Sequence, residues 1–194
     1  MPTITTTVED NSPLLTFDGW IIGASNGPDG LITSYSERNF MATTTQNATM
    51  TFNYNGTDVT LYGAQRGNHG RYQVTVDHTT YDPQSGYAAD PGKFQVTLFE
   101  SHGLQQGNHT VKISDIDGGQ WLDIDFVTWT STFGDPNAQL AITAVDDGDS
   151  AFGYSGTDWA NNPTDVGKYF GGTGHSTSTY NAKMQFKFTG MRYS

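Results

Sequence analysis

Apolar and polar residues alternate along much of this chain of 194 residues, whereas helical periodicity is nearly absent. Between residues 47 and 54, alanine, methionine, phenylalanine and tyrosine occupy every second position, as expected of a strand with one buried face. The same alternation predicts further strands over residues 59–62, 72–76, 94–98, 110–113 and 121–129. Turn-rich loops separate them, at residues 23–30, 66–70, 79–92 and 115–119. The pattern predicts an all-β fold, an antiparallel β-sandwich or jelly roll.

One of these segments occurs twice. Gln46–Gly56 returns near the end of the chain as Tyr180–Gly190, with Asn, Ala, Met, Phe and Gly at matching places. Upstream of the two copies, Val8–Asp10 aligns with Val145–Asp147, and a Phe-Asp-Gly-Trp motif aligns with the segment that ends at Trp159. Because the matches keep the same order, they predict tandem domains of one kind.

We therefore expect a complete β-sandwich over residues 3–130, a linker over 131–139 and a truncated second copy over 140–194. A truncated copy could not close its sheet, so its apolar strand face would be exposed unless something covered it. That face consists of Ala182, Met184, Phe186 and Phe188. We expect a fragment of a longer protein, or a partial copy packed on the first domain. Strand exchange between chains, which would give a homo-oligomer, is the second alternative.

The charge of the chain excludes some partners. Nine Lys and Arg residues stand against 20 Asp and Glu residues, a formal net charge of −11. This charge repels phosphate backbones and anionic lipid surfaces, so we expect neither a nucleic acid nor a membrane as partner. The chain has no cysteine, which rules out disulfides and thiol chemistry.

Three N-x-S/T sequons begin at Asn47, Asn55 and Asn108, and the composition is rich in Thr, Ser, Gly and Asn. These features favour a secreted glycoprotein. Met1-Pro2-Thr3 does not begin a signal peptide, so the leader of a secreted form would be absent from this numbering.

The succession of motifs resembles a known domain. V-E-D, F-D-G-W, N-A-x-M-x-F-x-Y-x-G, V-T-L-Y-G and W-L-D-I-D-F-V follow one another here as they do in a domain found, often in tandem, in secreted and cell-surface proteins of mushroom-forming fungi. The strand order also resembles the galactose-binding-like jelly roll of many carbohydrate-binding modules. The resemblance implies a glycan or cell-wall polysaccharide as ligand, although one fold can host unrelated functions.

Calcium-dependent modules of this type often place an acidic residue of the first strand near one of the last strand. The resemblance thus implies Glu9, Asp10 and Asp123 as candidate ligands of a structural calcium ion. Two other acidic segments, Asp115–Gly119 and Asp146–Asp149, also carry the carboxylates that calcium favours. For these two we favour a role in capping their own turns.

Aromatic side chains are the best candidates for contact with a sugar, because a sugar ring stacks its apolar face on Trp or Tyr while its hydroxyls need polar partners. An alternative for Trp20, and for Trp159 at the matching place of the repeat, is that each closes one end of a sandwich as a core residue. The candidate ligand-binding residues are Trp20, Tyr35, Arg66, His69, Arg71, Tyr81 and Tyr87.

No catalytic residue is assigned. The five histidines lack metal-binding spacing, and the Gly-x-Ser-x-Gly motif of a nucleophile elbow is absent from the sequence. The sequence therefore predicts a secreted, non-catalytic module that binds glycans or the cell wall. The alternatives are a glycan-active enzyme resembling a glycoside hydrolase, and a structural or assembly protein without a small ligand.

Overall fold

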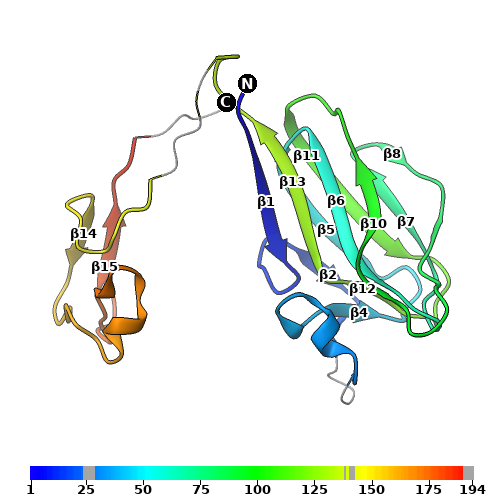
Figure 1. The fold of residues 1–194 in the computed structure, drawn as a ribbon, viewed down its shortest axis with the longest axis horizontal. Helices are drawn as coiled ribbons and strands as arrows, with labels where there is room; N and C mark the ends of the chain where they lie inside the picture. The colour runs from blue at the N-terminus through cyan, green and yellow to red at the C-terminus, as the bar shows by residue number, and fades with distance from the viewer. Residues whose placement is uncertain (24–28, 138, 140–142, 190–194) are drawn as a thin grey trace. The chain divides into compact units, whose positions relative to one another are not determined.

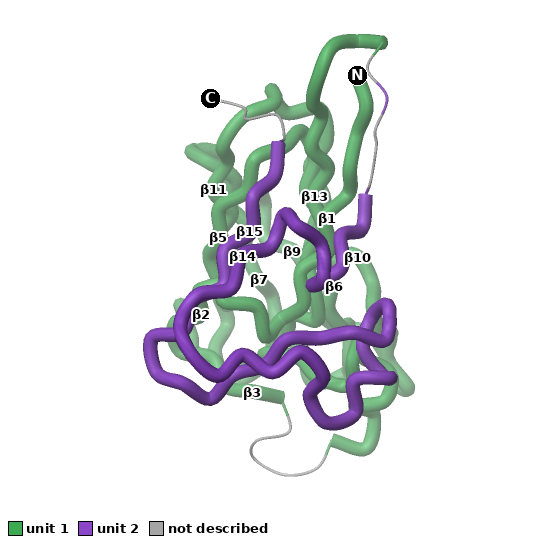
Figure 2. The backbone as a smooth tube through the Cα atoms, turned by 90° about the vertical axis from the view of Figure 1, so that its left-hand side faces the viewer, with its two compact units in different colours: residues 1–137 green, residues 138–194 purple. Residues whose placement is uncertain are grey.

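The computed structural model describes residues 1–23, 29–137, 139 and 143–189 (Figure 1). The chain forms two compact units, unit 1 (residues 1–137) and unit 2 (residues 138–194), which are coloured separately in Figure 2. Parts of the predicted loop 23–30, of the predicted linker 131–139 and of the predicted second copy 140–194 lie outside the described residues.

The first sheet of unit 1 has four antiparallel strands in the order β1-β13-β6-β10 (Figure 1). Its central pairing sets Val127 opposite both Val8 and Leu61, so that apolar residues of three strands line up on one face. The strands are β1 (Thr3–Glu9), β13 (Phe126–Thr132), β6 (Asp58–Gln65) and β10 (Lys93–Ser101).

The second sheet of unit 1 has six strands and is also antiparallel. Its strand β5 contains the alternating segment of the repeat, and Met50, Phe52 and Tyr54 point into the core as predicted. The strands are β2 (Thr16–Asp18), β5 (Thr49–Gly56), β11 (Gly107–Asp115), β7 (Arg71–Val76), β8 (Thr79–Thr80) and β9 (Gln84–Ser85).

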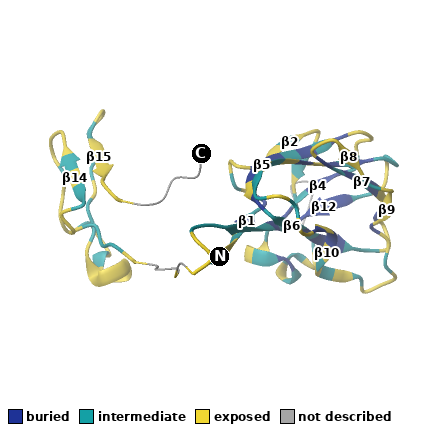
Figure 3. Cartoon of the chain, turned by 90° about the horizontal axis from the view of Figure 1, so that it is seen from above, coloured by how far each residue is buried: buried dark blue, intermediate teal, exposed yellow. Residues whose placement is uncertain are grey.

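The two sheets enclose one hydrophobic core, drawn dark blue in Figure 3. Met50, Val74 and Val111 from the second sheet pack in the same buried cluster as Leu61 and Val127 from the first. Fully burying such a side chain contributes about 1.5–3 kcal/mol. The prediction of an all-β antiparallel sandwich is confirmed.

A small third sheet lies at one end of unit 1, next to a double 3₁₀ turn. A second apolar cluster forms there around Tyr35, Phe40, Ala42 and Ala64. The elements are β12 (Leu122–Ile124), β4 (Met41–Thr43), β3 (Ile21–Ile22), η1 (Ile32–Ser34) and η2 (Ser36–Arg38).

The predicted single strand 121–129 is divided in the structure. β12 ends at Ile124 and β13 begins at Phe126, and the two belong to different sheets. Asp125 lies between them. Its backbone N–H donates to the carbonyl of Tyr62, and its side chain accepts a hydrogen bond from the backbone N–H of Ser36. The aspartate thus marks the point at which the chain passes from one sheet to the other.

Unit 2 is described by itself. It contains a two-stranded sheet of β14 (Phe152–Ser155) and β15 (Lys183–Phe186), together with η3 (Val166–Lys168) and η4 (Phe170–Gly172). None of its described residues is buried, and Met184, Phe186 and Phe188 are exposed, as Figure 3 shows by colour for this unit. No helix among the described residues of the chain has the length and apolar character needed to cross a lipid bilayer.

Gly63 of β6 tests how tightly the sheets are packed. A Cβ at this position would lie 2.5 Å from the carbonyl oxygen of Asp123 and 2.7 Å from Leu98 Cδ1. Gly63→Ala should therefore lower the free energy of unfolding by about 1–3 kcal/mol through overpacking. Gly30→Ala is the control, since a Cβ at Gly30 would meet no atom of the described part of the chain within 4 Å. Thermal unfolding measures both, and equal stability of the two variants would contradict the packing described.

Candidate functional site

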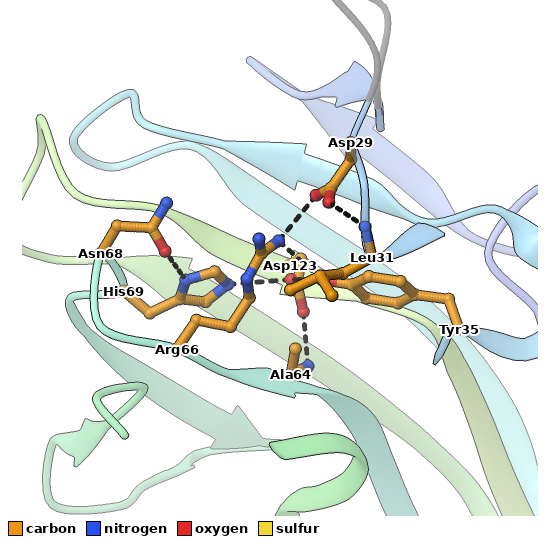
Figure 4. Close-up of polar contacts among 8 residues, drawn as sticks. All are labelled: Asp29, Leu31, Tyr35, Ala64, Arg66, Asn68, His69 and Asp123. Carbon is orange, nitrogen blue, oxygen red and sulfur yellow. Dashed lines mark hydrogen bonds and ion pairs between the residues drawn. The ribbon is translucent and has the colours of Figure 1, made fainter. Parts of the chain in front are cut away.

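A buried carboxylate lies between the two apolar clusters of unit 1. Asp123, on β12, accepts a hydrogen bond from the Tyr35 hydroxyl at 2.6 Å and another from the Ala64 backbone N–H at 2.6 Å (Figure 4). Its Oδ2 also lies 2.8 Å from His69 Nε2. The carboxylate therefore joins β12, β6, the loop after β6 and the double 3₁₀ turn.

This cluster is shielded from water. The side chains of His69 and Asp123 are each 2% exposed. Burial and the adjacent charge of Asp123 raise the pKa of Tyr35 far above its usual range, so its hydroxyl keeps its proton and remains a donor. Removing one member of such a pair leaves a buried charge without a partner, which typically costs about 3–5 kcal/mol.

Arg66 extends the cluster toward the surface. One guanidinium nitrogen donates to Asp29 Oδ2 at 2.7 Å and lies 3.5 Å from the Tyr35 hydroxyl (Figure 4). The guanidinium carbon also lies over the ring of Phe94, 5.6 Å from its centroid. Partial burial opposes ionisation of Asp29, but the hydrogen bonds from Arg66 and from the Leu31 backbone lower the pKa of this carboxyl below its ordinary value. The side chain of Arg66 is thus held in one position by Asp29, Tyr35 and Phe94.

A hollow of about 530 Å³ opens beside Arg66. Backbone hydrogen bonds from Arg66 to Gly86 and from Ala88 to Arg66 hold the end of β6 against the loop before β10, so that Tyr87 lies next to Arg66. Tyr87 is 60% exposed. The residues lining this Tyr87 hollow are Leu31, Arg66, Gly67, Asn68, Tyr87, Ala89, Asp90 and Pro91.

The structure brings four of the candidate ligand-binding residues together. Arg66 and Tyr87 line the Tyr87 hollow, and Tyr35 and His69 lie buried behind its wall, where they bond to Asp123. Their role is therefore to support the wall, because neither Tyr35 nor His69 is exposed.

The other three candidates lie elsewhere. Trp20 packs against the main core beside Phe17, which agrees with its alternative as a core residue. Tyr81 packs edge-on against Phe99, and Arg71 is exposed and binds the carboxylate of Asp117. None of the three lines the Tyr87 hollow.

Asn68, Asp90 and Asp29 were missed by the sequence analysis. Asn68 Oδ1 lies 2.9 Å from His69 Nδ1, and Figure 4 shows its Nδ2 pointing away from the ring. The only signal in the sequence was that Asn68 and Asp90 fall in two of the turn-rich loops, which does not distinguish them from many other polar loop residues.

A second acidic cluster gathers around Ser36. Both carboxylate oxygens of Asp125 accept from the Ser36 backbone N–H, at 3.0 and 3.1 Å, and Glu9 Oε1 accepts from the Ser36 hydroxyl at 3.0 Å. Glu9 Oε2 and Asp10 Oδ1 are buried without a hydrogen-bond partner among the described residues. The structure thus groups Glu9 and Asp10 with Asp125, whereas the third predicted calcium ligand, Asp123, is held by Tyr35, Ala64 and His69.

The chemistry of this cluster suits a hard cation. Burial raises the pKa of Asp10 to about 7, with a further contribution from the charge of Glu9. Burial likewise raises the pKa of Asp125 to about 7, although the Ser36 N–H opposes it. Among the described residues, no three His, Asp or Glu side chains converge as closely as a bound metal ion requires. Within Glu9, Asp10 and Asp125, two buried carboxylate oxygens lack a hydrogen-bond partner among the described residues, and carboxylate oxygens are the ligands that calcium favours.

The carboxylates of the other two acidic segments form hydrogen bonds with neighbouring groups of the protein. Asp115 Oδ1 accepts from the backbone N–H groups of Asp117 and Gly118, as expected of a capped turn. In unit 2, a hollow of about 460 Å³ includes Asp147, whose carboxylate bonds to His175 and to the Thr173 hydroxyl. Each of these two carboxylates thus has a protein partner, although Asp115 Oδ2 is buried without a hydrogen-bond partner among the described residues.

Comparison with family models gives no match. Among curated proteins, the chain is 26% identical over 153 residues to an A type blood alpha-D-galactosamine galactosaminidase of Flavonifractor plautii. The matched residues are 78% of this chain but only 14% of that protein.

Several solved structures are similar to this chain. A CBM36-1 domain of a xylanase from the hindgut metagenome of Trinervitermes trinervoides matches with a TM-score of 0.45 and 22% identity, over 68% of this chain and 99% of that one. A family two carbohydrate esterase of Cellvibrio japonicus (TM-score 0.47, 17% identity) and a GH26-CBM35 mannanase of Podospora anserina (TM-score 0.47, 18% identity) each match 68% of this chain. The matches span 35% of the esterase and 29% of the mannanase. The similar structures thus include carbohydrate-binding and carbohydrate-active domains.

The raised pKa values of Asp10 and Asp125 predict how stability depends on pH. In the unfolded chain both carboxyls titrate near an ordinary value of ~3.9, so between about pH 4 and 7 the folded state binds more protons than the unfolded state. Their contribution to stability is complete below about pH 4 and is lost as the pH rises through about 7. With a chelator present, the ionisation of Asp10 and Asp125 should lower Tm by about 5 °C or more as the pH rises from about 4 to about 7.

Other groups titrate in the same pH range and also change Tm. The slope of Tm against pH is therefore measured for wild type and for Asp125→Asn, and the difference between the two slopes gives the contribution of Asp125. The slope should be shallower in Asp125→Asn and unchanged in Asp82→Asn, which removes an exposed carboxylate elsewhere. Equal slopes in wild type and Asp125→Asn would contradict the assignment of Asp125 to this cluster.

Proposed function

We propose that this protein is a non-catalytic glycan-binding module whose ligand site is the Tyr87 hollow. The observation that carries the proposal is an exposed aromatic ring beside fixed polar side chains. Tyr87 offers a face on which a sugar ring can stack, and Arg66, Asn68 and Asp90 line the same hollow.

The polar side chains that line the Tyr87 hollow are held in fixed positions. Arg66 is held by Asp29 and Tyr35, and Asn68 is held by His69, so these groups lose little conformational freedom when a ligand binds. The buried carboxylate of Asp123 fixes both Tyr35 and His69. Preorganisation of this kind supports binding of small polar ligands such as sugars.

Binding is favoured over hydrolysis by the acids next to the hollow. Glycoside hydrolysis usually needs two carboxylates that are free to act on the bond. Asp29 accepts hydrogen bonds from Arg66 and from the Leu31 backbone, which leaves Asp90 as the free carboxylate of the lining. The curated relative is named as a galactosaminidase, but the matched part is a small fraction of it. Release of reducing sugar from a polysaccharide panel would favour the enzyme alternative.

Local structure supports the proposal that unit 2 is a second copy of the domain. Asn47 and Asn181, at matching places in the repeat, both have left-handed backbone, with φ of 66° and 63°. A double 3₁₀ turn occurs in each unit, as η1 and η2 in unit 1 and as η3 and η4 in unit 2. The strand β2 pairs with β5 through Phe17 and Met50, and β14 pairs with β15 through Tyr154 and Met184.

The assembly alternative has one specific observation in its favour, the exposed apolar side chains of unit 2. Tyr169, Phe170 and Phe188 are 52%, 70% and 78% exposed. Light scattering after size-exclusion chromatography distinguishes this alternative, because assembly predicts oligomers whose population grows with concentration. Secretion as a glycoprotein also remains a proposal, supported by the exposure of Asn47, Asn55 and Asn108.

Substitution of Tyr87 tests the proposed site. In a panel of fungal and plant oligosaccharides, Tyr87→Ala should weaken binding of the recognised glycan at least about tenfold, because the stacking face is lost. Tyr180→Ala is the matched control, since Tyr180 is an exposed tyrosine of unit 2. Isothermal titration calorimetry gives the affinities. Absence of binding to every glycan, or equal binding by wild type and Tyr87→Ala, would overturn the proposal.

We also propose a structural calcium ion at Glu9, Asp10 and Asp125. At about pH 8, excess calcium should raise Tm by about 5 to 10 °C in wild type, because the ion binds the folded state and relieves the repulsion between buried carboxylates. The increase should be much smaller in Asp10→Asn and unchanged in Asp82→Asn. Magnesium, which demands a tighter octahedral site, should be less effective than calcium. Identical calcium shifts in wild type and Asp10→Asn would sink the assignment.

A further inference from the structure

We propose that the Tyr87 hollow selects a cationic sugar, a hexosamine whose amine is free, over its N-acetylated and acidic counterparts. The inference rests on the proposed glycan-binding function and goes beyond it by naming the class of sugar. It follows from the balance of charge in the hollow and from the direction in which Asp90 points.

The positive charge of the hollow is already balanced. Arg66 donates to Asp29 at 2.7 Å, and both side chains are mostly shielded from water, at 20% and 17% exposed. A guanidinium held in this way still has N–H groups with which to donate, but its net charge is offset by the carboxylate 2.7 Å away. Arg66 therefore gives no net attraction to an acidic sugar.

Asp90 leaves a negative charge without a counterion. Among the described residues, its side chain has neither a hydrogen bond nor an ion pair, and it is exposed in the lining of the hollow. A Cβ built on Gly67 would lie 3.6 Å from Asp90 Oδ1, so the carboxylate points across the hollow toward Gly67. The lining, with the balanced pair of Arg66 and Asp29, thus carries one net negative charge at a defined place.

The other polar groups of the lining suit neutral hydroxyls. Asn68 uses its Oδ1 toward His69, and its Nδ2 points away from that ring, so the amide can donate to a sugar oxygen (Figure 4). The ring of Tyr87 accepts the apolar face of any pyranose. Asn68 and Tyr87 therefore provide affinity without distinguishing an amine from a hydroxyl, which leaves the choice to Asp90.

The expected selectivity follows from this division of roles. A protonated amine can form a charge-assisted hydrogen bond with the Asp90 carboxylate, and such bonds are stronger than neutral ones. N-acetylation removes the positive charge and adds bulk, and a uronic acid brings a second negative charge next to Asp90. The net charge of −11 on the whole chain adds to the repulsion of acidic sugars at low ionic strength.

Calorimetry with three oligosaccharides of similar length tests the proposal: a β-1,4-linked glucosamine oligomer, its fully N-acetylated form and a galacturonic acid oligomer. At about pH 6, where aspartate is ionised, the glucosamine oligomer should bind at least about tenfold more tightly than the N-acetylated form. The galacturonic acid oligomer should not bind measurably. Asp90→Asn should remove the preference for the free amine, and high salt should reduce it.

Two control variants separate local from general charge effects. Asp82→Asn removes one exposed carboxylate outside the lining and should leave the preference intact. Tyr87→Ala should weaken binding of the amine and the acetylated forms alike. If glycans bind but the amine and acetylated forms bind equally, or if Asp82→Asn lowers the preference as much as Asp90→Asn, the inference fails while the proposed function stands. If no glycan binds, the proposed function itself fails.

Discussion

Burial of the Asp123 carboxylate is the interaction on which unit 1 depends. This carboxylate lies between the two apolar clusters, where it accepts from the Tyr35 hydroxyl and the Ala64 backbone N–H and lies 2.8 Å from His69 Nε2. Because an unpaired charge at this depth would cost several kcal/mol, the double 3₁₀ turn, β6 and β12 must keep one relative arrangement. Even Gly63 is part of this constraint, since any side chain there would occupy the space next to the carboxylate.

The positions of the polar side chains that line the hollow depend on the same carboxylate. Tyr35 contacts both Asp123 and Arg66. His69 contacts both Asp123 and Asn68. Arg66 and Asn68, which line the hollow, are therefore held by the buried side chains of Tyr35 and His69.

The sequence was sufficient to predict the sandwich, because alternation reports directly which face of a strand is buried. It could not predict the break at Asp125, because Asp123 and Asp125 have the spacing of neighbours on one strand face while their side chains bind different partners. The sequence analysis proposed Tyr35 as a ligand-binding residue. Its burial could not be predicted, because its hydrogen bond to Asp123 joins residues 88 positions apart and no local pattern encodes that contact. Asn68 was missed for a similar reason, because the pairing of two loops places it beside Tyr87. Asp90 was missed because nothing in the sequence distinguishes it from other polar residues of its loop.

The backbone pairing of Arg66 with Gly86 and Ala88 has a consequence for how such a module diversifies. One wall of the hollow belongs to the scaffold, and the other is a surface loop of residues 87–91 that is absent from both core clusters. Surface loops tolerate changes in length and composition that a core does not. In the proposed glycan-binding module, exchange of this loop alone would therefore change the ligand preference, which makes residues 87–91 the place to graft or randomise in a search for binders of other sugars.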